Sequence, residues 1–287
     1  MSQIKVLITG TNGQLGSELR AICFDSEHVK YSFIGRSEMD LEKTDQIQEV
    51  LAQYSPDFIV HTAAYTAVDL AEDHPEIADK VNHLASLEIA KYCQANHCKM
   101  LYISSDYVFK GDANTPLKED YPTNPVNKYG ESKLKGEVAV LAAFPQAIII
   151  RTAWVYSVFG KNFVKTMINL MRNGKEVRVV NDQIGSPTYA GDLAEVIKHI
   201  VTLGYWEPGI YHYSNKGEVS WYDFAVVVRD FSKLDCEIIP IPSKEYPTLA
   251  QRPAYSLLNN NKIKKTFSVE IPNWQDSLKK MLMRLNY

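Results

Sequence analysis

A tyrosine and a lysine four positions apart, Tyr129 and Lys133, offer the clearest chemistry in the sequence. On a helix, positions i and i+4 share one face, so the phenol and the ammonium can both point into one cleft. A free tyrosine has a pKa of about 10, and a nearby cation favours the phenolate and lowers that pKa toward working pH. The pair is therefore suited to general acid–base chemistry in which Tyr129 gives or takes a proton.

The position of the pair favours a site over an ordinary surface helix. Tyr129 opens a helical stretch directly after the proline-containing loop 121–125. Upstream of that loop, the apolar run 100–104 ends in Ser104, Ser105 and Asp106, where an apolar strand would otherwise continue. A serine at such a strand end can donate a hydrogen bond to a substrate carbonyl and polarise it for hydride attack.

A glycine-rich turn near the N-terminus is typical of a dinucleotide site. The apolar run 4–9 leads into Gly10, Gly13 and Gly16 and then into a helical pattern. The first glycine allows a tight turn, the second lets backbone approach a pyrophosphate, and the third lets the helix pack on the sheet. The helix N-terminus adds free amides and a partial positive charge for the phosphates. Lys133 could then hold the hydroxyls of the nicotinamide ribose.

The end of the second strand bears on which dinucleotide is bound. Binding of NAD usually uses an acidic residue there, which accepts hydrogen bonds from the adenine ribose. Here the strand ends in Arg36 and Ser37, and a guanidinium suits the 2′-phosphate of NADPH. Glu38 and Asp40 follow closely, so we expect NADPH and keep NADH as the alternative.

The elements that must position these residues alternate along the first half of the chain. Strands are predicted at residues 4–9, 32–34, 58–62, 100–104 and 148–150, and helices at 13–24, 43–54, 76–96 and 129–143. Strands that are apolar on both faces and separated by helices indicate a parallel sheet covered on both sides. Right-handed crossovers make that sheet doubly wound, of the Rossmann α/β class.

Beyond residue 155, helices at 162–171, 189–203 and 278–285 are interleaved with loops rich in glycine, proline and aromatic residues. We expect an NAD(P)-binding Rossmann domain over residues 1–155. Residues 156–287 should form a smaller α/β lobe, mainly for substrate, with some crossing of the chain back to the first domain. Trp206, Trp221 and Trp274 should fill the core of that lobe, and packing alone explains the amphipathic helix 278–285.

Composition and charge argue against several other classes of protein. The 287 residues include 45% hydrophobic and 23% charged residues, which is ordinary for a globular chain. The net charge of −3 gives no case for nucleic acid or an anionic membrane as partner. No apolar run approaches the roughly 18 residues that a membrane-spanning helix needs. The N-terminus lacks a signal-peptide layout and the four cysteines are scattered, so we expect a cytoplasmic protein.

The glycine turn, the strand-end serine and the Tyr-x-x-x-Lys pair, in this order and spacing, resemble the extended short-chain dehydrogenase/reductases. Within them, the chain more closely resembles the family of dTDP-4-dehydrorhamnose reductases, at residues 61–69, 104–109, 125–130, 151–156, 182–188 and 252–256. The resemblance implies hydride transfer from NAD(P)H to C4 of a nucleotide-sugar, dTDP-4-dehydro-L-rhamnose. Tyr129 would give the proton to the new hydroxyl, with Lys133 and Ser105 as its catalytic partners.

The resemblance also implies individual contacts. With the residues argued above, the expected cofactor contacts are Gly10, Asn12, Gly13, Gln14, Leu15, Gly16, Arg36, Asp40, Leu41, Ala63, Ala64, Tyr65, Tyr129 and Lys133. Ser105 and Asp106 would hold the keto-sugar, and Trp154 would contact its hydrophobic face. Many relatives carry threonine where Ser105 stands, and serine keeps the hydroxyl. Arg252, in a poorly patterned segment, could cover the nucleotide diphosphate.

Some relatives use Mg²⁺ through acidic residues near positions like those of Glu18 and Asp192. Isolated carboxylates are common at surfaces, so we expect no metal site and keep these two residues as candidates. The sequence does not set the oligomeric state, and a homodimer stays open.

Two other functions stay open as well. An epimerase or dehydratase of the same superfamily would keep NAD bound through turnover. Asp106 fits a dehydratase in part, although Tyr107 stands where a second acidic residue is expected. A non-catalytic, NADP-binding regulatory subunit of methionine adenosyltransferase has the same fold, but it has no need of the Tyr129 and Lys133 pair.

Overall fold

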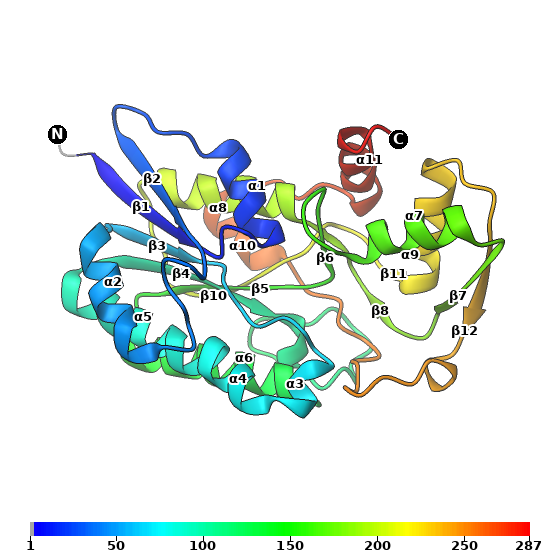
Figure 1. The fold of residues 1–287 in the computed structure, drawn as a ribbon, viewed down its shortest axis with the longest axis horizontal. Helices are drawn as coiled ribbons and strands as arrows, with labels where there is room; N and C mark the ends of the chain where they lie inside the picture. The colour runs from blue at the N-terminus through cyan, green and yellow to red at the C-terminus, as the bar shows by residue number, and fades with distance from the viewer. Residues whose placement is uncertain (1–2) are drawn as a thin grey trace.

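A six-stranded parallel sheet forms the centre of the computed structural model, which describes residues 3–287 (Figure 1). Its order is β2-β1-β3-β4-β5-β10 and every neighbouring pair is parallel. The strands are β1 (Ile4–Thr9), β2 (Val29–Ile34), β3 (Phe58–His61), β4 (Lys99–Ser105), β5 (Ile148–Thr152) and β10 (Gly209–Tyr213). The strand order reverses between β1 and β3, and open sheets bind ligands at the carboxyl ends of the strands at such a point. The predicted doubly wound parallel sheet is confirmed.

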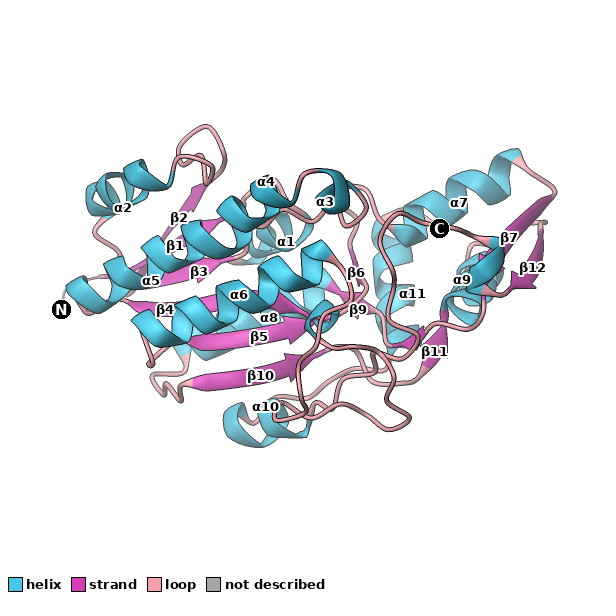
Figure 2. Cartoon of the chain, turned by 90° about the horizontal axis from the view of Figure 1, so that it is seen from below, coloured by secondary structure: helices cyan, strands magenta, loops and turns pink. Residues whose placement is uncertain are grey.

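Helices cover both faces of this sheet (Figures 1 and 2). One face carries α1 (Gln14–Ile22) and α8 (Ala190–Thr202), with α10 (Asn261–Phe267) against β10, and the other carries α2 (Ile47–Tyr54), α5 (Ala85–Asn96) and α6 (Lys128–Ala143). Val6 and Ile8 of β1 pack toward the first set, and Leu7 packs toward the second. Side chains of a strand alternate between faces, so a strand with both faces buried is apolar along most of its length.

The predicted helix 76–96 is interrupted in the structure. After α3 (Leu70–Asp73), the helix α4 (Pro75–Asp79) passes into a π-helical turn (Lys80–Leu84) before α5 begins. Asn82 lies in this turn, where its side chain accepts a hydrogen bond from Tyr65 N and donates one to Tyr65 O. The turn therefore holds the loop that follows β3, and π-helical turns within α-helices are frequent at functional sites.

A smaller lobe lies beside the carboxyl ends of the strands, on the right in Figures 1 and 2. It contains α7 (Phe163–Asn173), α9 (Trp221–Phe231), α11 (Trp274–Arg284) and the parallel pair β7 (Glu176–Val180) and β12 (Glu237–Ile241). Two short pairs complete it, β6 (Val155–Tyr156) with β9 (Thr188–Tyr189) and β8 (Ile184–Gly185) with β11 (Val219–Ser220). This lobe has an apolar core of its own, to which Met171, Phe224 and Leu278 contribute.

The chain crosses between the two parts several times. α8, β10 and α10 all follow residue 156 in the sequence, yet they complete the large sheet and one of its covering layers. Trp206 belongs to the same side, because its ring meets Phe58 edge-on at 5.6 Å and its Nε1 donates to Gln146 O. The expectation that Trp206 fills the smaller lobe is therefore wrong, since the loop before β10 already runs on the large sheet. Trp221 and Trp274 do pack in the smaller lobe.

A buried ion pair fixes α6, the helix of Tyr129 and Lys133, to the sheet. Arg151 of β5 donates from Nε and Nη2 to the two carboxylate oxygens of Glu137, at 2.9 and 2.7 Å. Both side chains are almost fully buried. A two-point contact of this kind sets the orientation of the helix as well as its distance from the strand.

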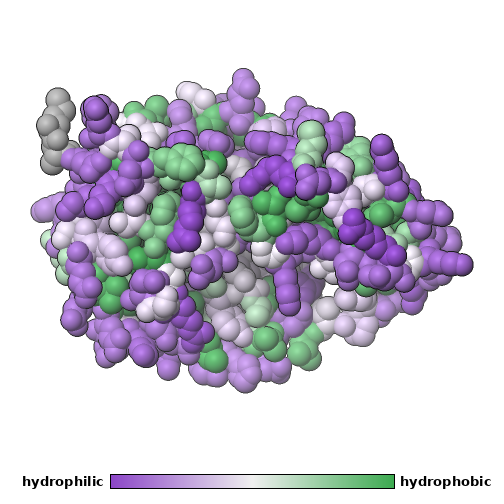
Figure 3. Space-filling model, turned by 45° about the horizontal axis from the view of Figure 1, so that its top comes forward, coloured by the Kyte–Doolittle hydropathy of each residue, from purple (hydrophilic) through white to green (hydrophobic). Residues whose placement is uncertain are grey.

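The outer surface is mainly hydrophilic on the face shown in Figure 3, with apolar side chains exposed between the polar ones in patches. Among residues 3–287 there is no helix long and apolar enough to cross a membrane.

Candidate active site

A cavity of about 920 Å³ opens at the carboxyl ends of the central strands. It brings together nearly all the residues expected from the sequence to touch cofactor or substrate. Those that line it are Gly10, Asn12, Gly13, Gln14, Leu15, Gly16, Arg36, Asp40, Leu41, Ala63, Ala64, Tyr65, Ser105, Asp106, Tyr129, Lys133 and Trp154. Arg252 does not line the cavity, and neither do the metal candidates Glu18 and Asp192.

The glycine turn forms one end of the cavity, and its shape depends on missing side chains. Gly10 has a φ of +74°, and a Cβ on it would lie 2.7 Å from Ala63 N. A Cβ on Gly16 would lie 2.2 Å from Gly10 O, so α1 could not approach the turn. Gly13 caps α1 without any side-chain hydrogen bond to its first amides. These amides at a helix N-terminus suit the phosphates of a dinucleotide.

Arg36 lies at the end of the cavity next to β2, where the adenosine of a dinucleotide would be bound. Its side chain is 75% exposed, and it pairs with Glu42 at 2.6 Å and with Asp40 at 3.5 Å. Glu38 is turned away from this role, because its carboxylate accepts a hydrogen bond from Gly35 N at 2.8 Å. That backbone bond also lowers the pKa of Glu38. The guanidinium is therefore the group at this end that fits a 2′-phosphate.

Tyr129 lies in the first turn of α6, which the Asn127 side chain caps by accepting a hydrogen bond from Gly130 N at 2.8 Å. The ring of Tyr129 packs edge-on against Tyr107 at 5.4 Å. Burial raises the pKa of Tyr129 well above its usual value, and the neighbouring Ser105 hydroxyl offsets part of that rise. The lowering of this pKa that is expected from Lys133 together with the charge of the nicotinamide stays a prediction for the cofactor-bound protein. A protonated phenol is the form that a proton donor requires.

Lys133 is fully buried against the floor of the cavity. Its Nζ donates to Tyr102 Oη at 2.8 Å and to the Ile103 carbonyl oxygen at 2.7 Å, rather than to Tyr129. Burial lowers the pKa of Lys133 to about 7. Tyr102 was not among the residues predicted for the site, because it lies within a run predicted as an apolar strand. A buried tyrosine hydroxyl usually finds a hydrogen-bond partner. A tyrosine within a strand buried on both faces was therefore the one sign in the sequence that Tyr102 makes a polar contact.

Ser105 and Asp106 follow one another at the end of β4. The Ser105 hydroxyl accepts a hydrogen bond from Tyr107 N at 3.2 Å and donates to Asp106 Oδ1 at 3.0 Å. The second carboxylate oxygen of Asp106, Oδ2, is buried and has no hydrogen-bond partner among residues 3–287. Burial raises the pKa of Asp106 to about 6. An acceptor left in this state is suited to a hydroxyl of a bound ligand.

Trp154 follows β5 and adopts a backbone conformation that is rare for bulky residues, with a φ of +48°. Its ring stacks on Trp221 of α9, with centroids 3.7 Å apart and an interplanar angle of 11°. A Cβ on Gly185 would lie 2.9 Å from the Trp154 ring. The indole is thus fixed on several sides, and Trp154 lines the cavity.

Arg252 does not line the cavity but contacts Tyr107, a residue that does. Its Nη1 donates to Tyr107 Oη at 2.9 Å and its Nη2 to Asp69 Oδ2 at 2.7 Å. The side chain thereby links the loops that follow β3 and β4 to the C-terminal segment. In this arrangement Arg252 supports Tyr107, the ring against which Tyr129 packs.

The loop before α7 also reaches the cavity, which the sequence analysis did not anticipate. Gly160, Lys161 and Asn162 line it. Asn162 caps α7 by accepting a hydrogen bond from Lys165 N, and its Nδ2 donates to Gln14 Oε1 at 3.0 Å. An asparagine directly before a helical pattern predicts that its side chain caps the helix. The contact of Asn162 with Gln14, 148 positions away in the sequence, does not follow from any local pattern.

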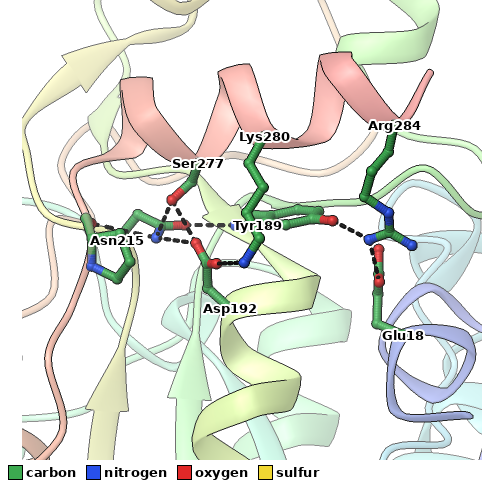
Figure 4. Close-up of polar contacts among 8 residues, drawn as sticks. Glu18, Tyr189, Asp192, Asn215, Ser277, Lys280 and Arg284 are labelled. Carbon is green, nitrogen blue, oxygen red and sulfur yellow. Dashed lines mark hydrogen bonds and ion pairs between the residues drawn. The ribbon is translucent and has the colours of Figure 1, made fainter. Parts of the chain in front are cut away.

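Glu18 and Asp192 do not fit a divalent cation, because each carboxylate already has a cationic partner on α11 (Figure 4). Glu18 accepts hydrogen bonds from Arg284 Nη1 at 2.7 Å and from Ser157 Oγ at 2.6 Å. Asp192 accepts from Lys280 Nζ at 3.2 Å. Its other oxygen accepts from two further groups, Asn215 Nδ2 and Ser277 Oγ. Among residues 3–287, no group of three or more histidine, cysteine, aspartate or glutamate residues could hold a metal ion.

The fold and this cavity define an NAD(P)-dependent oxidoreductase of the Rossmann class. A family model described as "RmlD substrate binding domain" matches residues 4–287, and the chain belongs to this family. A dTDP-4-dehydrorhamnose reductase from Aggregatibacter actinomycetemcomitans is 38% identical over 288 residues, which cover 96% of this chain and 97% of that protein. The family resemblance seen in the sequence is thereby confirmed.

Two solved structures are similar over nearly the whole chain. A dTDP-4-dehydrorhamnose reductase from Clostridium acetobutylicum is 35% identical with a TM-score of 0.94, covering 99% of this chain and 100% of its own. A dTDP-4-dehydrorhamnose reductase from Bacillus anthracis, solved in complex with NADP, is 36% identical with a TM-score of 0.92 and the same two coverages.

Proposed function

We propose that the protein reduces the C4 keto group of dTDP-4-dehydro-L-rhamnose with NADPH and forms dTDP-L-rhamnose. The observation that carries this proposal is that one cavity contains both the glycine turn and Tyr129, Lys133 and Ser105. The name of the relative from Aggregatibacter actinomycetemcomitans, which this chain matches over nearly its full length, supports the choice of sugar nucleotide.

Each residue has a defined task in the proposed reaction. The cofactor, when bound, supplies a hydride to C4. The Ser105 hydroxyl rotates from Asp106 Oδ1 toward the keto oxygen, donates its one hydrogen bond there and polarises the carbonyl. Tyr129 gives its phenolic proton to that oxygen, so that the C=O group becomes CH–OH. The Lys133 ammonium holds the cofactor ribose and stabilises the phenolate that remains on Tyr129.

Two further contacts would orient the sugar. The unpartnered Oδ2 of Asp106 would accept a hydrogen bond from a sugar hydroxyl. The indole face of Trp154 would pack against the apolar side of the ring and its methyl group. Together these two contacts fix which face of the carbonyl is presented to the hydride.

The preference for NADPH rests on Arg36 and Glu38. Arg36 lines the cavity, whereas the Glu38 carboxylate is bound to the backbone of its own turn and does not line the cavity. The ribose hydroxyls of NADH would lack the acidic partner they usually have at this position. Asp40 does line the cavity and could accept from those hydroxyls, which leaves NADH as the second cofactor.

The test is the consumption of NADPH, and then of NADH, with a panel of dTDP-, GDP- and UDP-linked 4-keto sugars. We expect turnover with dTDP-4-dehydro-L-rhamnose and a higher kcat/KM with NADPH. A purified protein that carries stoichiometric NAD and converts a sugar nucleotide without added NADPH would instead be an epimerase or dehydratase. Binding of NADP without reduction of any 4-keto sugar would favour a regulatory subunit.

A further inference from the structure

The Lys133 ammonium has three N–H donors, and the wall of the cavity uses two of them. One goes to Tyr102 Oη at 2.8 Å and one to the Ile103 carbonyl oxygen at 2.7 Å. Lys133 itself lines the cavity, so the remaining donor is the one left for a ligand. The ammonium is tetrahedral, so two N–H bonds held by residues of β4 also fix the direction in which the third N–H bond points.

Tyr102 is held as rigidly as the lysine that it contacts. Its hydroxyl donates to the Asn82 carbonyl oxygen at 3.0 Å, and this leaves its lone pairs for the ammonium. Its ring stacks on His61 with centroids 5.5 Å apart, and the Lys133 Nζ lies 4.2 Å from the ring centroid. The phenol therefore offers the cation both an oxygen and the edge of a π face.

Gly136, one turn beyond Lys133 on α6, makes room for this arrangement. A Cβ there would lie 2.7 Å from Tyr102 Oη and 2.2 Å from the Asn82 carbonyl oxygen. Asn82 belongs to the π-helical turn before α5. A π-helical turn, a glycine on the facing helix and a buried tyrosine thus converge on one hydroxyl group.

We propose that Tyr102 is a positioning residue for the reduction, whose hydroxyl fixes the Lys133 ammonium with its third N–H directed into the cavity. Tyr102 touches neither substrate nor cofactor in this role and acts through Lys133. The proposal rests on the proposed function, because it assigns Tyr102 to the lysine of the same site.

The other titratable groups around Lys133 leave it without a dedicated counter-ion. On α6, Glu137 is engaged by Arg151, and Tyr129 is held protonated by its burial. From β3, His61 is neutral, since burial lowers its pKa to about 3. The dipoles of Tyr102 and of the Ile103 carbonyl therefore stabilise the ammonium, and the loss of the phenol oxygen must lower the pKa of Lys133 further.

The test is the Tyr102→Phe substitution, which removes one oxygen and keeps the ring. Loss of a hydrogen bond to a charged group predicts that kcat at neutral pH falls about tenfold to a hundredfold. The basic limb of the pH profile of kcat should move to lower pH. The reaction requires Lys133 as an ammonium, and the lower pKa of Lys133 in this variant means that the ammonium loses its proton at a lower pH. Activity should recover when the pH is lowered, until other groups titrate.

Tyr213→Phe is the matched control. Tyr213 is also fully buried, and its hydroxyl has no hydrogen-bond partner among residues 3–287. This variant should keep the wild-type pH profile, and thermal melts should show whether both variants fold. A Tyr102→Phe enzyme whose kcat falls equally at every pH, or whose basic limb stays in place, would overturn the proposal.

A second readout separates this proposal from the proposed function. The affinity for NADPH, measured by fluorescence titration from acidic to basic pH, should weaken at a lower pH in Tyr102→Phe than in the wild type. That shift requires no turnover and remains measurable if no keto sugar is reduced. If NADPH affinity has the same pH dependence in both proteins, Tyr102 does not govern the Lys133 ammonium. If the shift occurs but no 4-keto sugar is reduced, the proposed function fails and the positioning role stands.

Discussion

Replacing Tyr129 by phenylalanine removes the proposed proton donor and very little else. The ring can keep its edge-on contact with Tyr107, whose centroid lies 5.4 Å away. Because the contact between the two rings is retained, we expect the free energy of unfolding to change by less than about 1 kcal/mol. A positioned general acid contributes about 10²–10⁴-fold to a rate, which corresponds to a barrier higher by about 2.7–5.4 kcal/mol. The variant should therefore lose at least about a hundredfold in kcat.

Cofactor binding should respond much less to Tyr129→Phe. The phenol can supply at most a single hydrogen bond to the cofactor, worth about 0.5–1.5 kcal/mol, or roughly twofold to tenfold in affinity. The assay measures loss of nicotinamide absorbance in single turnovers at saturating NADPH, and fluorescence titration measures the cofactor Kd. Tyr156→Phe, which removes a buried hydroxyl without a partner among residues 3–287, serves as control. Equal losses in kcat and in cofactor affinity, or a kcat loss below tenfold, would refute the assignment.

Three other perturbations test separate parts of the structure. Arg36→Ala should raise the KM for NADPH about tenfold and leave that for NADH nearly unchanged, because only NADPH has a 2′-phosphate; equal effects in steady-state kinetics would contradict the cofactor assignment. Glu137→Gln should lower the free energy of unfolding in urea by about 3–5 kcal/mol, since it leaves a buried arginine unpaired. Glu88→Gln, which breaks a partly exposed pair with Lys91, should cost less than about 1 kcal/mol, and similar losses in both variants would count against the buried pair. Neither Mg²⁺ nor EDTA should shift the melting temperature or kcat, because Glu18 and Asp192 already have cationic partners. A clear effect of EDTA would show that a metal cation binds elsewhere or displaces Arg284 and Lys280 from these carboxylates.

The sheet could be predicted from the sequence because its strands are apolar on both faces. The observed β1 matches the predicted range 4–9, and β2, β3, β4 and β5 differ from their predicted ranges by a few residues at the ends. The sixth strand, β10, was not predicted. Boundaries inside the helical stretch 76–96 could not be predicted in the same way. The π-helical turn there is held by the bonds of Asn82 to the backbone of Tyr65, a tertiary contact that leaves no mark in the local periodicity.

In the candidate site, too, residues with a meaningful spacing could be predicted from the sequence, and residues that act through tertiary contacts could not. The glycine turn and the Tyr129 and Lys133 pair have spacings that carry a physical meaning, and the structure brings them into one cavity. Tyr102 could not be found by spacing, since its role depends on β4 lying beside α6. For Arg252 the sequence suggested a ligand contact, because an arginine in a loop near the site can bind a phosphate group. Its partners in the structure are instead Tyr107 and Asp69.

The C-terminal helix α11 does more than pack against the smaller lobe. The apolar stripe of residues 278–285 predicts a helix that serves packing, and Leu278, Met281 and Leu282 do pack in the smaller lobe. On another side of α11, however, Arg284 reaches Glu18 of α1, 266 positions earlier in the chain (Figure 4). The same carboxylate accepts from Ser157, so one buried charge joins α11, α1 and the segment after β6. Since the glycine turn before α1 and the loop that follows the β6 segment both line the cavity, the last helix of the chain helps to hold this end of the cavity in place.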